Sequence, residues 1–306
     1  MTERDGFATL RAGGLDWDAL PLRLWRKGNA LFWNAADIDL TQEADGWRTL
    51  SGPDVEAASR LSAMFLAGEE AVTHDIQPFL AAMAAEGRLG DEMYLAQFCF
   101  EEARHTEAFR LWFDAVGETG DLTPLVADNP GYRAIFLDAL PSALSALADD
   151  PSPANQLRAS VVYNHIVEGV LALTGYHAWE QVCRDRGILP GMQTIIRRIG
   201  VDERRHMAWG TYTCRRHVAA DPALWQVVEQ TMAEMLPLAL SAIEFLSLYD
   251  RPLGLDVQDF VAYAAERAQR RLGAIAAAQT GGSAAVEADL SPIALEDELA
   301  GDADPA

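Results

Sequence analysis

Long helical runs are the feature of this sequence that most constrains its fold. Each run keeps apolar residues at helical spacing, begins behind a capping or proline signal, and ends at a glycine or an Asp-Pro pair. A run of about 30 residues is roughly 45 Å long at 1.5 Å per residue. Helices of this length bury their apolar sides by packing along one another in an up-and-down bundle. The four longest predicted helices span residues 54–86, 89–116, 154–186 and 191–219.

Three further predicted helices complete an all-α domain: 131–148, 223–248 and 257–278. Alternating apolar segments joined by hairpin turns, which would indicate strands, are missing from the sequence. We therefore predict a single helical domain over residues 1–278. From residue 279 to 306 the sequence is small, polar and acidic, which predicts a flexible or surface-draped tail.

Composition limits the partners and the compartment. The chain has 46 Asp and Glu against 24 Lys and Arg, a net charge of -22, which argues against nucleic acid and anionic membranes as partners. It shows no signal peptide, and no uncharged apolar stretch approaches the roughly 20 residues of a membrane span. Cys99, Cys183 and Cys214 are far apart and form no CxxC pair. A reduced, cytoplasmic protein is the simplest interpretation.

Two glutamate–histidine pairs stand out. Glu102 and His105, and likewise Glu203 and His206, are three residues apart, so each pair shares one helix face. The flanking residues are apolar, which argues against the alternative that the pairs are merely ion-paired, solvated helix faces. A buried carboxylate beside a buried imidazole needs a partner that offsets the cost of desolvation.

Each pair follows a long helix that carries another glutamate in an apolar stretch. Glu69 lies 33 residues before Glu102, and Glu168 lies 35 residues before Glu203. The chain thus repeats one unit, a Glu followed one helix hairpin later by Glu-x-x-His. This is the ligand arrangement of ferritin-like di-metal carboxylate bundles. Four carboxylates, two imidazoles and no thiolate favour two iron or manganese ions over structural zinc.

Two neighbouring glutamates compete with these predicted ligands. The spacing to His105 selects Glu102 over Glu101, which we expect to point outward or to support the ligands from behind. Nothing in the spacing separates Glu69 from Glu70.

The sequence resembles the ligand-binding oxidases that share the fold of the ribonucleotide reductase small subunit. The resemblance extends over nearly the whole chain and includes the stretches GGLDWDALPLRLWRKGNALFW, AGEEAVTHDIQPF, DEMYLAQFCFEEARHTEAFRLW, ASVVYNHIVEGVLALTGY and RRIGVDERRHMAWGTYTCRRHVA. It implies a ferritin-like four-helix core with additional helices, and a homodimer. It also favours Glu69 over Glu70.

The resemblance implies a mixed manganese–iron cofactor that activates O2. Two irons are compatible with the same residues, because both ions accept this set of ligands. By position, Glu69, Glu102 and His105 would hold manganese, Glu168, Glu203 and His206 would hold iron, and Glu102 would bridge.

The resemblance further implies a long-chain fatty acid in an apolar pocket and an ether cross-link between a valine and a tyrosine. These would be Val72 and Tyr163. Val72 follows Glu69 by three residues, so a helix places it beside the site. Tyr163 precedes Glu168 by five residues, about 140° round an ideal helix, so its assignment rests on the resemblance alone. Tyr176 corresponds to a second tyrosine near the site.

We therefore predict an O2-dependent oxidase that acts on a fatty-acid-like or other apolar ligand and uses an electron donor that the sequence does not identify. The alternative is a true ribonucleotide reductase small subunit, which stores a radical for a partner. Many such subunits carry a radical tyrosine four residues after the first metal-binding histidine, where this chain has Phe109. A radical-less variant also carries phenylalanine there. A fatty-acid carrier with structural metals is a third possibility.

Overall fold

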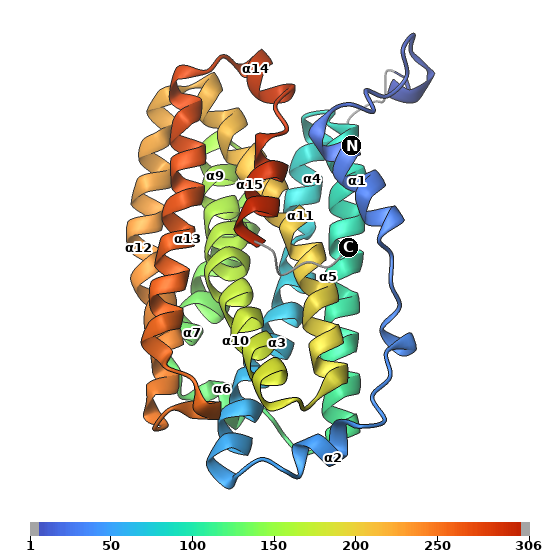
Figure 1. Cartoon of the computed structure of the whole chain (residues 1–306). Helices are drawn as coiled ribbons and strands as arrows, with labels where there is room; N and C mark the ends of the chain where they lie inside the picture. Colours follow the sequence, from blue (N-terminus) through green and yellow to red (C-terminus); the bar gives the residue numbers. More distant parts are fainter. Residues whose placement is uncertain (1–5, 301–306) are drawn as a thin grey trace.

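The structure is a computed structural model that describes residues 6–300. In this part of the chain every regular element is a helix, and the long helices lie side by side in an elongated bundle (Figure 1). The predicted all-α class is confirmed. The helices of the first half are α1 (Leu20–Ala30), α2 (Glu43–Trp47), α3 (Gly52–Asp75), α4 (Gln77–Ala85), α5 (Leu89–Val116), α6 (Pro124–Ala127), α7 (Pro130–Arg133) and α8 (Leu140–Asp149).

The second half continues the bundle. A π-helical segment, η4 (Val161–Ala172), joins two of its helices into one continuous rod, and a second one, η3 (Ala134–Ala139), joins α7 to α8. The helices are α9 (Pro153–Ser160), α10 (Leu173–Arg186), α11 (Pro190–Ala220), α12 (Trp225–Glu244), α13 (Val257–Ala276), α14 (Ser283–Glu287) and α15 (Ser291–Ala300). Short 3-10 turns, η1 (Ala8–Leu10), η2 (Ala35–Asp37), η5 (Pro222–Leu224), η6 (Phe245–Leu248), η7 (Pro252–Gly254) and η8 (Ala277–Thr280), link these elements.

Four elements position the functional site: α3, α5, η4 and α11. Helix α3 packs along α5, η4 packs against α11, and α5 also contacts α11. The start of α11 is held by Glu43 of α2, whose carboxylate accepts hydrogen bonds from the backbone N–H groups of Gly191 and Met192 at 2.7 and 3.2 Å. A buried carboxylate at this end satisfies N–H groups that have no partner within the helix and suits the helix dipole.

The predicted helix 54–86 is two helices, which meet at Ile76. Pro78 lies in the first turn of α4, where it has no N–H to continue the hydrogen-bond pattern of α3. After the break, α4 packs against α5 and α8.

The predicted helix 154–186 contains the π-helical segment η4, which includes both Tyr163 and Glu168. Hydrogen bonds from residue i to i+5 widen each turn, so a residue five positions away comes closer to the same face than it does in an α-helix. The widened turns therefore offer a physical reason for an approach of Tyr163 to the site that the α-helical period does not predict.

Residues Pro222–Leu248 form one stretch long and apolar enough to cross a membrane by length and composition, with 28% of its most apolar window buried. The sequence-based expectation of no membrane span did not anticipate this stretch. Helix α12, which makes up most of it, packs against α7, α13 and η4 of the bundle.

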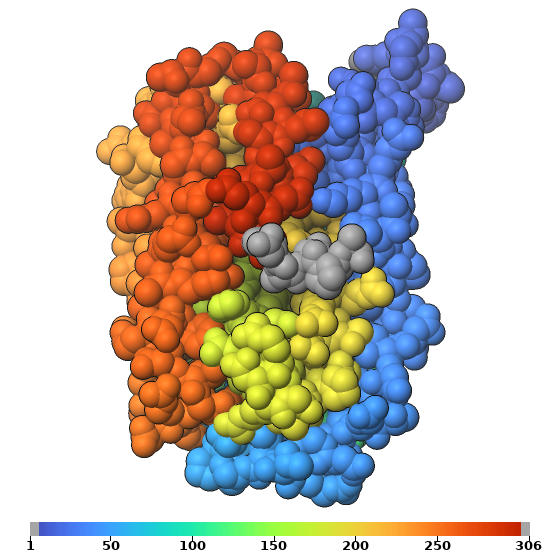
Figure 2. All heavy atoms as spheres, in the orientation of Figure 1, coloured from blue at the N-terminus to red at the C-terminus, as the bar shows by residue number. Residues whose placement is uncertain are grey.

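The acidic segment after residue 278 is not a loose tail over residues 279–300. Helices α14 and α15 pack against α11 and lie across one face of the bundle beside α13 (Figures 1 and 2). Glu296 of α15 forms a buried ion pair with Arg271 of α13, with N–O distances of 2.7 and 2.8 Å. Of the two predicted alternatives, this arrangement corresponds to the surface-draped one, and the buried partner of Glu296 is a feature that the acidic composition did not indicate. The rest of the predicted tail, 301–306, lies outside the described residues.

Candidate metal centre

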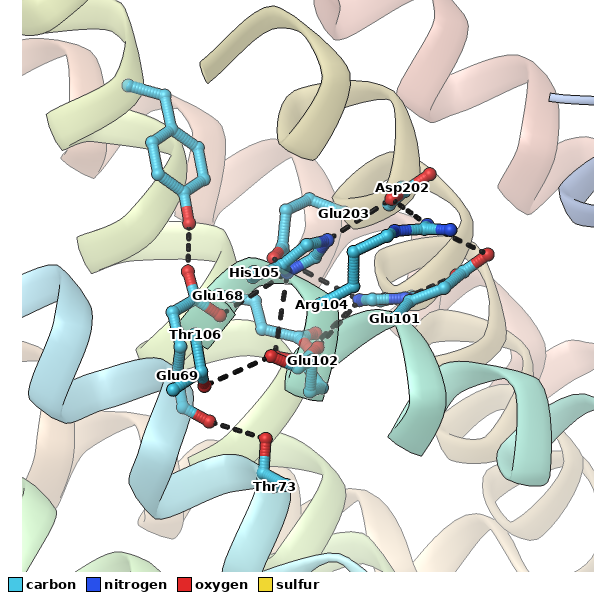
Figure 3. A network of polar contacts seen from close by, with 12 residues as sticks. Glu69, Thr73, Glu101, Glu102, Arg104, His105, Thr106, Glu168, Asp202 and Glu203 are labelled. Carbon is cyan, nitrogen blue, oxygen red and sulfur yellow. Dashed lines mark hydrogen bonds and ion pairs between the residues drawn. The ribbon is translucent and has the colours of Figure 1, made fainter. Parts of the chain in front are cut away.

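The six predicted metal ligands meet in the interior of the bundle, where all of them are buried. Figure 3 shows Glu69, Glu102, His105, Glu168 and Glu203 of this set. Their side chains come from four different elements and point toward one another. Glu69 lies on α3, Glu102 and His105 on α5, Glu168 on η4, and Glu203 and His206 on α11.

Potential ligand atoms form two adjacent groups, each with its atoms within 4.8 Å of one another. The first group is Glu69, Glu102, His105 and Glu203, and the second is Glu102, Glu168, Glu203 and His206. Glu102 and Glu203 belong to both groups, whereas the resemblance names Glu102 alone as the bridge. Two adjacent sites that share carboxylates are the arrangement of a di-metal centre.

The second group contains buried polar atoms that converge without satisfying one another. His206 Nδ1 lies 3.0 Å from Glu102 Oε1, 3.5 Å from Glu168 Oε1 and 3.6 Å from Glu203 Oε2. Within the described part of the chain, none of these four atoms has a hydrogen-bond partner. Buried polar atoms are almost always hydrogen-bonded, so four such atoms around one point fit ligands of a common cation.

The carboxylates also carry more negative charge than their protein surroundings balance. Burial raises the pKa of Glu69 to about 8, even though His105 Nδ1 lies 3.3 Å from its Oε2. Burial and the adjacent Glu203 raise the pKa of Glu168 well above its usual range. Glu102 differs, because contacts with His105 and His206 outweigh burial and lower its pKa to about 2. Divalent cations at these positions would supply the missing positive charge and displace protons.

Each histidine is oriented from behind by a carboxylate of the facing helix. His105 Nε2 lies 3.1 Å from Asp202 Oδ2, and His206 Nε2 lies 3.0 Å from Glu101 Oε2. Such contacts leave Nδ1 of each ring free to face the metal positions and fix the tautomer. Glu101 is therefore a buried supporting residue, the second of the two roles that the sequence left open for it.

Asp202 is a site residue that the sequence analysis missed. A signal for it exists, because an acidic residue directly precedes the predicted Glu ligand in both motifs, EEARH and DERRH. Three donors besides His105 also reach its carboxylate. Trp33 Nε1 donates to Oδ2 at 2.8 Å, Arg104 to Oδ2 at 2.6 Å, and Arg205 to Oδ1 at 2.6 Å.

The predicted ligand Glu69 is held by the predicted site residue Tyr176. The Tyr176 hydroxyl donates to Glu69 Oε1 at 2.5 Å, and its ring stacks on Phe65, which in turn stacks on Phe109. Glu70 is exposed and belongs to neither group of ligand atoms. The spacing in the sequence did not separate Glu69 from Glu70, and the structure places Glu69 in the cluster.

An apolar cavity reaches the cluster. The carboxylates of Glu69, Glu102, Glu168 and Glu203 lie close together in its lining, and we call this part of the wall the polar end. Val72, which follows Glu69 by three residues on α3, also lines the cavity. Apolar side chains make up most of the remaining wall, among them Leu61, Phe65, Phe136, Val167, Leu171, Leu246, Leu253 and Phe260.

Tyr163 is fully buried beside the cluster. Its ring centre lies 5.5 Å from that of Phe98, which itself stacks over His206 at 3.5 Å. Its hydroxyl has no hydrogen-bond partner among residues 6–300. Burial, together with the charges of Glu102 and Glu168, raises its pKa well above the usual value, so the phenol keeps its proton.

This fold and these six candidate ligands are those of the ribonucleotide reductase small chain, and the model of that family matches residues 21–277. A solved R2-like ligand-binding oxidase with an aerobically reconstituted Mn/Fe cofactor is 35% identical, with a TM-score of 0.84 over 89% of this chain and 98% of that chain. The R2-like ligand-binding oxidase from Sulfolobus acidocaldarius is 33% identical, with a TM-score of 0.84 over 92% of this chain and 99% of that chain. The chain belongs to the R2-like ligand-binding oxidases of the ribonucleotide reductase small-chain family, and the predicted family and oxidoreductase class are confirmed.

Proposed function

We propose that this protein is an O2-activating oxidase that holds one manganese and one iron and acts on a long-chain fatty acid or a similar apolar ligand. The observation that carries the proposal is the continuity between the apolar cavity and the carboxylate cluster. Glu69, Glu102 and His105 would hold manganese, and Glu168, Glu203 and His206 would hold iron, with Glu102 and Glu203 placed to contact both. When bound, the metals supply the reduction of O2 and the oxidising power for a C–H bond.

The protein's own residues position the reactants and exclude water. Tyr176 donates a hydrogen bond to Glu69 and fixes that carboxylate in the wall of the cavity. The apolar wall removes water from the ligand, whose carboxylate would point toward the cations at the polar end.

Val72 and Tyr163 are the proposed site of an internal ether cross-link. Its formation joins the Val72 side chain to the Tyr163 oxygen, removes one hydrogen from each residue, and uses O2 as the oxidant. Burial of both residues and the unpartnered Tyr163 hydroxyl support the proposal.

The alternative of a radical-storing reductase subunit is weaker because of Phe109. Its side chain is fully buried and stacks on Phe65, in the position where a radical tyrosine would need a hydroxyl. Activity with a ribonucleotide reductase large subunit would restore that alternative.

We also propose a cytoplasmic homodimer that receives electrons from a donor still to be identified. The three cysteines are all unpaired, which suits a reducing compartment. The stacked rings of Phe32 and Phe100 are 61% and 54% exposed and form an aromatic surface that a second copy would bury.

Loading the metal-free protein with Mn(II) and Fe(II) in air tests the proposal. Mass spectrometry of tryptic peptides is expected to show the Val72 and Tyr163 peptides joined and lighter by two hydrogens. Unlinked peptides from fully loaded protein would contradict the cross-link. Turnover of a labelled fatty acid separates an oxidase from a carrier, because a carrier releases the label unchanged.

A further inference from the structure

The candidate metal centre has two halves, which share Glu102 and Glu203. The His105 half adds Glu69 and His105, and the His206 half adds Glu168 and His206. The two halves differ in the groups that contact each histidine on the side away from the metal positions.

Behind His105, the Asp202 carboxylate accepts hydrogen bonds from several other donors. Its Oδ2 accepts from Trp33 at 2.8 Å and from Arg104 at 2.6 Å before it meets His105 Nε2 at 3.1 Å, and its Oδ1 accepts from Arg205 at 2.6 Å. Much of its charge is therefore already neutralised by other donors.

Behind His206, the Glu101 carboxylate is freer. Its Oε1 accepts from Arg205 at 2.7 Å and lies 3.8 Å from Arg104, but its Oε2 meets His206 Nε2 at 3.0 Å. Within residues 6–300, no other donor is recorded for that oxygen. Glu101 Oε2 can therefore polarise the His206 ring more strongly than Asp202 polarises His105.

The carboxylate ligands differ in the same direction. Glu69, in the His105 half, accepts a short hydrogen bond of 2.5 Å from the phenol of Tyr176. Glu168, in the His206 half, accepts a longer one of 2.9 Å from the amide of Asn164. A short bond from an acidic O–H withdraws more charge from the accepting carboxylate. Glu69 and His105, the two ligands that only the His105 half uses, are therefore expected to donate less electron density to a metal than Glu168 and His206.

These differences bear on the choice of metal. A carboxylate hydrogen-bonded to the far nitrogen of a ligand imidazole makes the near nitrogen a better donor. Imidazole suits iron, whereas oxygen ligands suit manganese, and iron(II) binds nitrogen-containing sites more tightly than manganese(II) does. We infer that Glu101, acting through His206, is the positioning residue that makes the His206 half select iron and leaves the His105 half to manganese. The inference rests on the proposed Mn/Fe cofactor and gives it a structural cause.

Metal occupancy tests this inference directly. Metal-free wild type and Glu101→Gln are loaded with equal Mn(II) and Fe(II), and anomalous diffraction at both metal edges gives the occupancy of each half. The glutamine keeps the shape of the side chain but removes its charge. We expect the preference of the His206 half for iron over manganese to fall about tenfold, while the His105 half stays unchanged.

The matched control is Glu296→Gln, which also removes a carboxylate from a buried arginine but touches no metal ligand. It is expected to lower stability and leave the metal distribution unchanged. If Glu101→Gln does not fold, Glu101→Asp replaces it, and a smaller shift of the His206 half toward manganese is expected. An unchanged distribution in a fully loaded Glu101 variant, or an equal change in both halves, overturns the inference.

The wild-type arm separates this inference from the proposed function. The same metal in both halves of wild type would contradict the Mn/Fe cofactor itself. Manganese and iron in wild type, with iron in the His105 half, would leave the cofactor intact and overturn the inference alone.

Discussion

Two clusters of buried charge lie in this bundle, and they are balanced in different ways. The Arg271–Glu296 pair between α13 and α15 is 2% exposed, and its two N–O contacts satisfy both carboxylate oxygens. Arg271 Nη1 also donates to the carbonyl of Gly169 at 3.0 Å. In the candidate metal centre, by contrast, four carboxylates face two imidazoles, and several of their polar atoms have no hydrogen-bond partner within residues 6–300. Burial of charge alone therefore does not indicate a functional site. A surplus of buried negative charge that no protein group balances does indicate one.

The strongest test of this contrast is Glu102→Gln, because both groups of ligand atoms use Glu102. We expect the affinity for each of the two ions to fall by more than about 100-fold, beyond the usual 10–100-fold effect of a supporting residue. Metal content after dialysis, measured by inductively coupled plasma mass spectrometry, checks it. Glu296→Gln is the control and should bind two ions. Full loading of Glu102→Gln would remove Glu102 from the ligand set.

The second test concerns the balanced cluster. Glu296→Gln leaves the charge of Arg271 buried without its counter-ion and is expected to cost about 3–5 kcal/mol of unfolding free energy. The double change Arg271→Met and Glu296→Leu should restore stability to within about 1 kcal/mol of wild type or better, because it removes both charges together. Urea unfolding of the metal-free protein measures both. A double variant as unstable as the single one would show that the pair contributes more than mutual neutralisation.

The third test uses pH to expose the surplus charge. Glu69 has an ordinary pKa of 4.5 and a pKa of about 8 in the folded protein, because of its burial. Between these values the folded protein keeps a proton that the unfolded chain has lost, so raising the pH favours unfolding. The metal-free protein should lose up to about 1.4 kcal/mol of stability per pH unit between pH 5 and 8.

Metal loading should flatten this dependence, because the cation takes the place of the proton. Glu69→Gln is the matched variant in the metal-free protein and should flatten it as well. Urea unfolding at several pH values provides the measurement. An equally steep fall in Glu69→Gln would assign the effect to other groups.

Local periodicity accounts for what the sequence could predict. The pairs Glu102/His105 and Glu203/His206 lie within one turn of one helix, so their spacing alone places them on a common face. The helical class and the lengths of α5 and α11 follow from the same regularity. Departures from regular helical periodicity, such as the break at Ile76, were not predicted.

Contacts that depend on packing between distant segments could not be predicted from the sequence. Asp202 meets His105 across 97 positions of the chain, and Glu296 meets Arg271 only because α15 folds back along α11 and α13. Tyr163 lies in the π-helical turns of η4, which a period of 3.6 residues does not predict. In each case the missing information was which helix faces which.

The smallest expected effect compares two adjacent residues of α3. Glu69 is buried in the cluster, whereas Glu70 is exposed and outside it, although both lie in the same apolar stretch. Glu70→Gln should change the unfolding free energy by no more than about 0.5 kcal/mol, as surface substitutions usually do. It should also leave two bound metals, while Glu69→Gln should weaken the His105 half. Metal analysis and urea unfolding of both variants make the comparison. Because the two residues are neighbours on one helix, loss of metal in Glu70→Gln alone would mean that α3 presents its other face to the site.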